Sequence, residues 1–475
     1  MSLEDRLYPL LGAYQSLPRR VQAALGTAYR CLPESWRWGS RYREFVELAE
    51  ACERWSIDAI RQYQTRQLRM VLHHAANYCP YYQAKFARAG FRPEEVREPE
   101  DLRRCPTLDK RELIDHLEEF ASAEVKRPRR LYMTTGGSTG VPVGFYLQKG
   151  VSRPKEQAFL EQMWRRAGYR KGAKLVVIRG HVTTEKTDGS ISFYDATRNW
   201  LMLSSYHLTR QRMPEYLSAV EKFKPDMIHA YPSAALQMAE FLEAAGQHWR
   251  TPVRALLCGS ERLTVSQKRL LERAFGCGVY HWYGHSERVV LAGEGARSEL
   301  LYFVPCYGFV EFGPPDADGL CELIGTSFHN LAMPLIRYRT GDYVRLADPR
   351  KNGPLEFPWP AVAEVVGREQ EFLLSSGGRR ISLTALNMHD RIFDDLYAVQ
   401  FYQEQPGVAE FRYVPTPNFQ KTRLPEIETR IRRKLGDDFV LETREVRDVE
   451  RTARGKHKWL VSRLAESAIA APASS

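Results

Sequence analysis

The chain has 475 residues, of which 43% are hydrophobic and 27% charged, and it carries a formal net charge of +11 at pH 7. Its length predicts two or three domains with a full hydrophobic core, and no apolar run approaches the roughly 20 residues of a membrane-spanning helix. Neither a signal-peptide pattern nor a basic nucleic-acid-binding module is recognisable, so the positive charge favours nucleotides or a membrane surface as anionic partners.

The cysteine pattern argues against two further features, a disulfide framework and a zinc site. Eight cysteines are scattered along the chain without a CxxC pair, which argues against a disulfide framework and against a regular zinc motif. We therefore expect free thiols and a cytoplasmic location.

Residues 1–65 form a basic, helical N-terminal extension. Two apolar stripes recur at helical spacing in it: Val21, Ala24, Leu25 and Ala28, then Phe45, Leu48, Ala49 and Cys52. Trp36 and Trp38 lie among arginines and could contact a membrane surface. The pattern favours the other interpretation, in which an amphipathic pair of helices packs on the main body.

Residues 66–367 alternate between helical and strand patterns. After a helical stretch through Leu68 and Leu72, apolar runs predict strands, and amphipathic runs predict helices between them. The strands are expected at 173–178, 227–230, 255–258 and 278–282, and the helices at 213–223, 234–245 and 266–275. This order predicts an α/β domain that binds ligands at its strand ends.

Residues 368–475 read differently, with short strands at 398–402, 410–414 and 440–446 around one helix at 427–435. This pattern predicts a small, separate α+β domain. The expected fold class is therefore α/β: a large N-terminal domain with α/β layers and a small C-terminal α+β domain.

A glycine-rich loop follows the strand-like residues Leu131–Met133, and its residues are Thr134, Thr135, Gly136, Gly137, Ser138, Thr139 and Gly140. Glycines let the backbone approach a ligand closely, and hydroxyl groups add donors, so the loop suits phosphate oxygens. It is not a Walker A loop, because no Gly-Lys-[Ser/Thr] follows.

Other short motifs follow the loop in order, and each is weak alone. They are Ser260-Glu261, the run from Tyr283 and Gly284 to Glu287, Tyr338 to Asp342, Gly367-Arg368, and Arg454-Gly455-Lys456. The ordered set resembles the adenylate-forming superfamily of acyl- and aryl-CoA synthetases. Within it, the chain is most similar to the phenylacetate–CoA ligase-like branch, which includes members associated with capsule polysaccharide genes. The resemblance covers most of the chain after residue 60 or so.

The resemblance implies an ATP-dependent ligase that activates a carboxylic acid as an acyl- or aryl-adenylate, releases pyrophosphate and passes the acyl group to CoA. An alternative acceptor is a carrier protein or an amino group in surface or capsule polysaccharide biosynthesis. A degenerate, non-catalytic nucleotide-binding member is a third hypothesis. The implied cofactors are ATP, Mg²⁺ and CoA, and the C-terminal domain is expected to rotate between the two half-reactions.

Site residues follow from the same resemblance. The loop from Thr134 to Gly140 would hold the β- and γ-phosphates, Ser260 and Glu261 would line the adenine edge, and Tyr283 would stack on adenine. Ser286 would lie near the α-phosphate, Asp342 would accept hydrogen bonds from the ribose hydroxyls, and Arg368 would lie near the ribose. Glu287 would hold magnesium, for which one protein oxygen is enough when phosphates and waters complete the shell.

The remaining assignments concern catalysis, the hinge and the acid. Lys456 matches the catalytic lysine, which bridges the attacking carboxylate and the α-phosphate, and Lys458 is its competitor. Gln370 replaces the usual charged hinge pivot, and Val143 stands where many relatives carry a basic residue. The resemblance implies that the acid lies beside His229, Tyr231, Pro232 and Ser233, at the end of the strand predicted at 227–230. Arg179 and His181 are expected near it as well.

Overall fold

The computed structural model describes most of the chain. It covers residues 3–7, 10–134, 143–180, 191–316, 319–348, 350, 353–366, 372–382, 386, 391–393, 395–416, 418–450 and 458–464. Of the predicted site residues, Thr135 to Gly140, Arg368 and Lys456 therefore lie outside the described residues, as do His181 and Gln370.

The α-helices and strands follow each other in an order that matches the predicted alternation. The helices are α1 (Leu3–Leu7), α2 (Leu11–Ser16), α3 (Arg19–Cys31), α4 (Glu34–Arg37), α5 (Ser40–Cys52), α6 (Ile57–Tyr78), α7 (Pro80–Ala89), α8 (Lys110–Asp115), α9 (Leu117–Phe120), α10 (Ser152–Arg166), α11 (Met213–Phe223), α12 (Pro232–Ala244), α13 (Val265–Phe275) and α16 (Leu424–Leu435). The strands of the body are β1 (Arg130–Thr134), β2 (Gly144–Gln148), β3 (Leu175–Arg179), β4 (Ser192–Asp195), β5 (Trp200–Ser204), β6 (Met227–Ala230), β7 (Ala255–Gly259), β8 (Gly278–Gly284), β9 (Leu291–Glu294), β10 (Leu301–Phe303), β11 (Gly308–Pro315), β12 (Cys321–Ser327), β13 (Tyr338–Leu346) and β14 (Ala361–Val366). The later strands are β15 (Phe372–Leu374), β16 (Arg380–Ser382), β17 (Leu396–Gln403), β18 (Val408–Pro415), β19 (Val440–Glu445) and β20 (Leu460–Ser462).

Twelve of the described strands of the body form one sheet in the order β11-β12-β13-β14-β10-β9-β8-β7-β6-β3-β5-β4, and β1 and β2 pair in a separate two-stranded sheet. Strands β5, β3, β6, β7 and β8 run parallel, and antiparallel strands continue the sheet on both sides. The four strands predicted from apolar runs are β3, β6, β7 and β8, each within two residues at either end. The α/β fold is confirmed.

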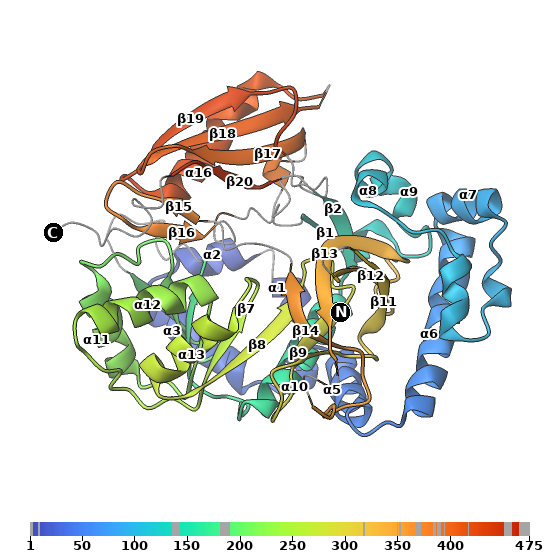
Figure 1. The fold of residues 1–475 in the computed structure, drawn as a ribbon, viewed down its shortest axis with the longest axis horizontal. Helices are drawn as coiled ribbons and strands as arrows, with labels where there is room; N and C mark the ends of the chain where they lie inside the picture. The colour runs from blue at the N-terminus through green and yellow to red at the C-terminus, as the bar shows by residue number, and fades with distance from the viewer. Residues whose placement is uncertain are drawn as a thin grey trace.

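Both faces of the parallel strands are buried, as expected where helices cover a parallel sheet on each side. Alternate residues such as Val177 and Leu257 join one apolar cluster with α10, whereas Val176 and Leu256 join another with α11 and α12. In Figure 1, α11, α12 and α13 lie over the near face of this part of the molecule and the blue N-terminal helices behind it. Positions 179, 229, 259 and 282 therefore lie on the face of the sheet that α10 covers.

The N-terminal helices pack in two different ways. Phe45, Ala49 and Cys52 of α5 are buried in the core as predicted. The packing predicted for the other stripe is wrong: on α3, Val21 and Leu25 are 42% and 51% exposed. Helix α3 instead packs its opposite face on the loop before β5, where a Cβ at Gly26 would lie 2.8 Å from that of Ala196. Gly26 permits this close contact because it has no side chain, and the apolar stripe then faces away from the body.

Within the described residues, no helix combines the length and apolar character needed to cross a membrane. The exposed stripe of α3 therefore belongs to a surface helix.

The C-terminal region forms a separate layer, drawn in orange to red at the top of Figure 1. Its strands have the order β19-β18-β17-β20, and α16 buries Ile427, Ile431 and Leu435 against them. This is the small α+β unit that the sequence predicts. The domain limits at residues 65 and 367 stay a prediction: α6 runs across the first, and residues 367–371 are not described.

Arg379 connects this layer to the body. It lies between β15 and β16 and is 5% exposed. Its guanidinium donates to the carbonyl oxygen of Tyr206 in the body, to that of Leu435, and to the carboxylate of Asp438, with Nε 3.2 Å from Oδ2. Burial acts to raise the pKa of Asp438, but the bond from Arg379 outweighs it and lowers that pKa.

We predict that Arg379→Met lowers the free energy of unfolding by about 3 kcal/mol, because it leaves Asp438 and two carbonyl groups without their buried cation. Urea denaturation followed by circular dichroism measures the change. Arg423→Met is the matched control, since Arg423 pairs with Asp395 inside the C-terminal layer. Equal stability of Arg379→Met and the wild type would contradict the role given to this arginine.

Candidate active site

The motifs predicted to hold a nucleotide meet at the ends of β8 and on β13. The hydroxyl of Tyr283 donates a 2.7 Å hydrogen bond to Oδ2 of Asp342, which is 6% exposed. Thr340, on the same face of β13, turns its hydroxyl to the backbone N–H of Asp342 at 3.1 Å. The structure thus brings together two motifs that are 59 residues apart in sequence.

Glu287 is joined to the same strand. Its Oε1 accepts a 2.8 Å hydrogen bond from the hydroxyl of Tyr338, and its Oε2 lies 3.2 Å from Nδ1 of His285. Burial acts to raise the pKa of the Glu287 carboxyl, but the hydrogen bond and charge of His285 and the charge of Lys110 outweigh it and lower that pKa to about 2. The group is therefore an ionised, buried carboxylate.

This carboxylate suits magnesium as a single protein ligand. Each oxygen already accepts one hydrogen bond and keeps a second lone pair, and a carboxylate is the hard ligand that Mg²⁺ prefers. Among the described residues, no group of three or more His, Cys, Asp or Glu side chains could hold a metal ion. An ion bound here would need phosphate oxygens and waters to complete its octahedron.

The predicted phosphate loop follows β1. Thr134 ends β1 and is buried, and Val143 is buried where the described chain resumes. No basic residue stands at position 143, but the charge of Lys110, the first residue of α8, acts on Glu287. Lys110 therefore places a positive charge near the predicted phosphate site, a role that its position in the sequence alone did not indicate.

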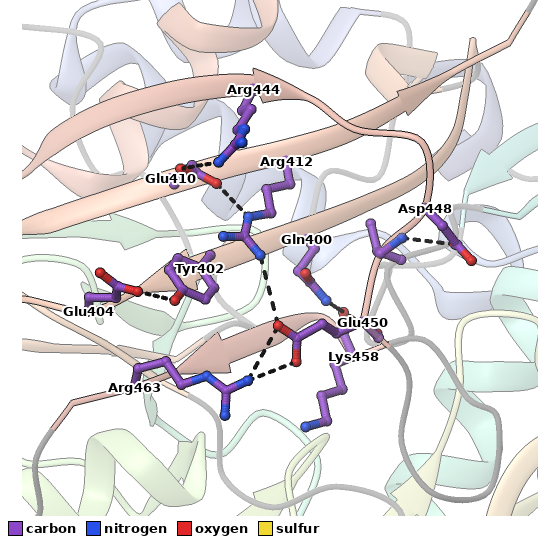
Figure 2. Close-up of polar contacts among 11 residues, drawn as sticks. Gln400, Tyr402, Glu404, Glu410, Arg412, Arg444, Asp448, Glu450, Lys458 and Arg463 are labelled. Carbon is purple, nitrogen blue, oxygen red and sulfur yellow. Dashed lines mark hydrogen bonds and ion pairs between the residues drawn. The ribbon is translucent and has the colours of Figure 1, made fainter.

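Lys456 belongs to a segment whose two ends are described. The backbone N–H of Lys458 donates to the carbonyl of Glu450 at 2.9 Å. The buried amide of Gln400, on β17, donates to the carbonyls of both Glu450 and Lys458 (Figure 2). The Glu450 carboxylate is held by Arg463 at 3.2 Å and lies 4.0 Å from Arg412. The two described ends of this segment are thus fixed to the C-terminal sheet.

Ser260 and Glu261 follow β7, where the chain turns sharply. Ser260 has a φ of +71°, a strained conformation for a residue other than glycine. The Glu261 carboxylate accepts hydrogen bonds from the backbone N–H of Ser233 at 2.9 Å and from its hydroxyl at 3.1 Å. Glu261 therefore caps the start of α12, where a negative charge is favourable, and its carbonyl lies 3.1 Å from Nε2 of His281.

The residues predicted to line the acid lie at the neighbouring strand ends. His229 is buried on β6, with its ring 4.9 Å from that of Trp164 on α10 and 6.4 Å from that of Trp282 on β8. Tyr231 and Pro232 are buried at the start of α12. Arg179, the last residue of β3, donates to Nε2 of His229 at 2.9 Å and to the hydroxyl of Ser260 at 2.5 Å.

Sequence reasoning gave no role to several neighbours of these residues, although Tyr338 and His285 lie within motifs that it named. Tyr338 and His285 hold Glu287, and Gln400 holds the segment that carries Lys456. A signal for Tyr338 was present, because residues 338, 340 and 342 alternate on one strand and so share a face. No comparable signal existed for Gln400, which is over 50 residues from the loop it holds.

Comparison with known proteins gives clear relatives, although no family model matches the chain. The chain is 30% identical over 308 residues to phenylacetate-coenzyme A ligase of Escherichia coli K12, covering 61% of this chain and 68% of that protein. It is 28% identical to the Pseudomonas putida enzyme of the same name, covering 70% and 75%. It is 23% identical to Protein CapK of Staphylococcus aureus, covering 77% and 81%.

A solved structure shares the fold. It is 2-hydroxyisobutyryl-CoA ligase, in complex with its adenylate and CoA in the thioesterification state. The TM-score is 0.57, the sequence identity is 16%, and the match covers 88% of this chain and 92% of that one. The match extends over both the body and the C-terminal layer, so the two-part architecture is shared.

We predict that the stability contributed by Glu287 depends on pH. Its folded pKa of about 2 lies below the usual 4.5, so the contribution is fully present above pH 4.5 and is lost as the pH falls towards 2. The advantage of the wild type over Glu287→Gln in urea unfolding should therefore shrink between pH 5 and pH 3. Glu47→Gln, at an exposed position of α5, is the control. A constant difference between wild type and Glu287→Gln would contradict the assignment.

Proposed function

Because the chain belongs to the phenylacetate–CoA ligase family of adenylate-forming enzymes, we propose that it uses ATP to activate a carboxylic acid and then transfers the acyl group to coenzyme A. The observation that carries this proposal is the pair of tyrosine–carboxylate bonds at the strand ends. They hold Asp342 on β13 and Glu287 just after β8, the two carboxylates that a bound Mg·ATP would need, both buried and hydrogen-bonded.

In the first half-reaction, a carboxylate oxygen of the acid attacks the α-phosphorus of ATP. The new O–P bond forms as the bond to pyrophosphate breaks, so the enzyme must mainly position the groups and stabilise negative charge. We assign this to Lys456 as a movable point charge. Magnesium bound at Glu287 would neutralise charge on the phosphates. In the second half-reaction the CoA sulfur attacks the acyl carbonyl, and AMP leaves.

The nucleotide would lie along the strand ends. Tyr283 would stack on adenine with Gly284 beside it, and Asp342 would bind the ribose hydroxyls, with Arg368 nearby. Ser260 and Glu261 would border the adenine, Ser286 would lie near the α-phosphate, and the loop from Thr134 to Gly140 would hold the other two phosphates. The acid would lie beside His229, Tyr231, Pro232 and Ser233, on the side of α10.

We predict that Lys456→Ala slows ATP–pyrophosphate exchange by about 100-fold or more, because it removes one charge from the transition state. Nucleotide binding measured by calorimetry should change little, since ribose and adenine contacts remain. Lys458→Ala is the matched control two residues away and should keep the exchange rate. A fast Lys456→Ala enzyme beside a slow Lys458→Ala enzyme would move the assignment to Lys458.

We also propose that the enzyme contacts anionic membranes through α3. Val21, Ala24, Leu25 and Ala28 form an exposed apolar stripe on this helix, and Arg6, Arg19 and Arg20 are exposed around it. An amphipathic helix with arginine beside its apolar face is typical of interfacial helices. A second copy of the chain would instead bring arginines against arginines, so a lipid surface is the more complementary partner.

We predict that replacing both Val21 and Leu25 with Glu weakens sedimentation with phosphatidylserine-containing vesicles by about tenfold or more, because it removes apolar contact and adds repulsion. Vesicles of phosphatidylcholine alone should bind the wild type weakly, and salt should weaken binding to the anionic vesicles. Val265→Glu, at an exposed apolar position of α13, is the control. Equal binding of wild type and double variant would contradict the proposal.

A further inference from the structure

Arg179 occupies a central position at the ligand-binding edge of the sheet. It is the last residue of β3, which lies beside β6, and its guanidinium reaches His229 on β6 and Ser260 after β7. The same group lies over the ring of Tyr231, 4.6 Å from the ring centre. Residues from the ends of three neighbouring parallel strands, β3, β6 and β7, therefore meet at one cation. Parallel sheets bind ligands at these strand ends.

All of these partners are neutral. A guanidinium has only donors, so Nε2 of His229 must accept, which places the imidazole proton on Nδ1 and leaves the ring uncharged. Within the described part of the chain, no carboxylate pairs with Arg179, whereas the buried or half-buried side chains of Arg166, Arg337 and Arg379 pair with Glu53, Glu311 and Asp438. The charge of Arg179 is thus held in place but not neutralised.

Two further donors lie beside the same imidazole. The indole N–H groups of Trp164 and Trp282 are buried and make no hydrogen bond within the described residues. Gly259 leaves room for the second indole, because a Cβ there would lie 2.3 Å from a ring carbon of Trp282. A buried donor without an acceptor is costly, so the two indoles leave unmatched hydrogen-bond donors beside the His229 ring.

We propose that Arg179 binds a second anionic group on the substrate, so that the enzyme prefers dicarboxylic acids over monocarboxylic acids. The inference rests on the proposed function and specifies its acid. The reacting carboxylate loses its charge when it becomes part of the adenylate, whereas a carboxylate elsewhere on the acid keeps its charge through both half-reactions. Arg179 is pre-positioned for such a group, because two of its N–H groups are used and the planar fork still offers the others.

The position of Ser260 supports a functional role for this arrangement. Its left-handed backbone turns the hydroxyl towards Arg179, and strain of this kind persists where the surrounding structure over-determines it, often at ligand sites. Replacing Ser260 would free one guanidinium hydrogen bond without removing the charge. Arg179 is therefore the specificity residue, and Ser260 and His229 orient it.

The test is ATP–pyrophosphate exchange with α,ω-dicarboxylic acids of increasing chain length, each paired with the monocarboxylic acid of the same carbon number. The wild type should show a kcat/KM at least about tenfold higher for the best diacid than for its matched monoacid, as a charge-assisted pair predicts. Arg179→Met should abolish this preference. Arg179→Lys should restore part of it.

The matched control is Arg254→Met. Arg254 lies just before β7, at the end of β7 opposite to Ser260, and it is paired with Asp226. It should keep the diacid preference. A wild type that prefers the monoacids throughout, or an Arg179→Met enzyme with raised KM for ATP and unchanged acid preference, would overturn the inference while leaving adenylation established. Absence of exchange by the wild type with every acid would overturn the proposed function as well.

Discussion

Two tyrosine–carboxylate hydrogen bonds between the end of β8 and strand β13 organise this molecule. Tyr283 holds Asp342, and Tyr338 holds Glu287. The end of β8 and strand β13 therefore each supply one tyrosine and one carboxylate to this pair of bonds. A buried carboxylate is costly unless hydrogen-bonded, and these bonds stabilise one carboxylate on β13 and one just after β8. They join two of the motifs that are predicted to bind the nucleotide.

Charged side chains of opposite sign lie at different places along the same edge of the sheet. Negative groups gather near β13, where they suit a metal ion and ribose hydroxyls. The cation of Arg179 lies farther along the edge, beyond β7, among neutral partners. In the C-terminal layer, Gln400 fixes the two described ends of the segment that contains Lys456, and Arg379 joins this layer to the body.

The N-terminal helices show how packing can reverse a reasonable expectation. The stripes on α3 and α5 have the same helical spacing, yet α5 buries its stripe against α10 and α3 exposes its own. The difference lies in Gly26 and its neighbours, which allow the less apolar face of α3 to approach the body closely. Periodicity identifies an apolar face, but it does not say whether protein or another surface covers it.

The sequence alone determined the α/β class, the positions of β3, β6, β7 and β8, the small C-terminal unit and the ordered motifs that indicate an adenylate-forming ligase. These depend on short-range patterns, since strand and helix periods and turn residues are local properties. Only the tertiary structure decided which motifs touch. The bonds of Glu287 to Tyr338, of Arg179 to His229 and of Gln400 to the Lys456 segment join residues 50 or more positions apart. Such contacts follow from the order of strands in the sheet, which no local pattern encodes.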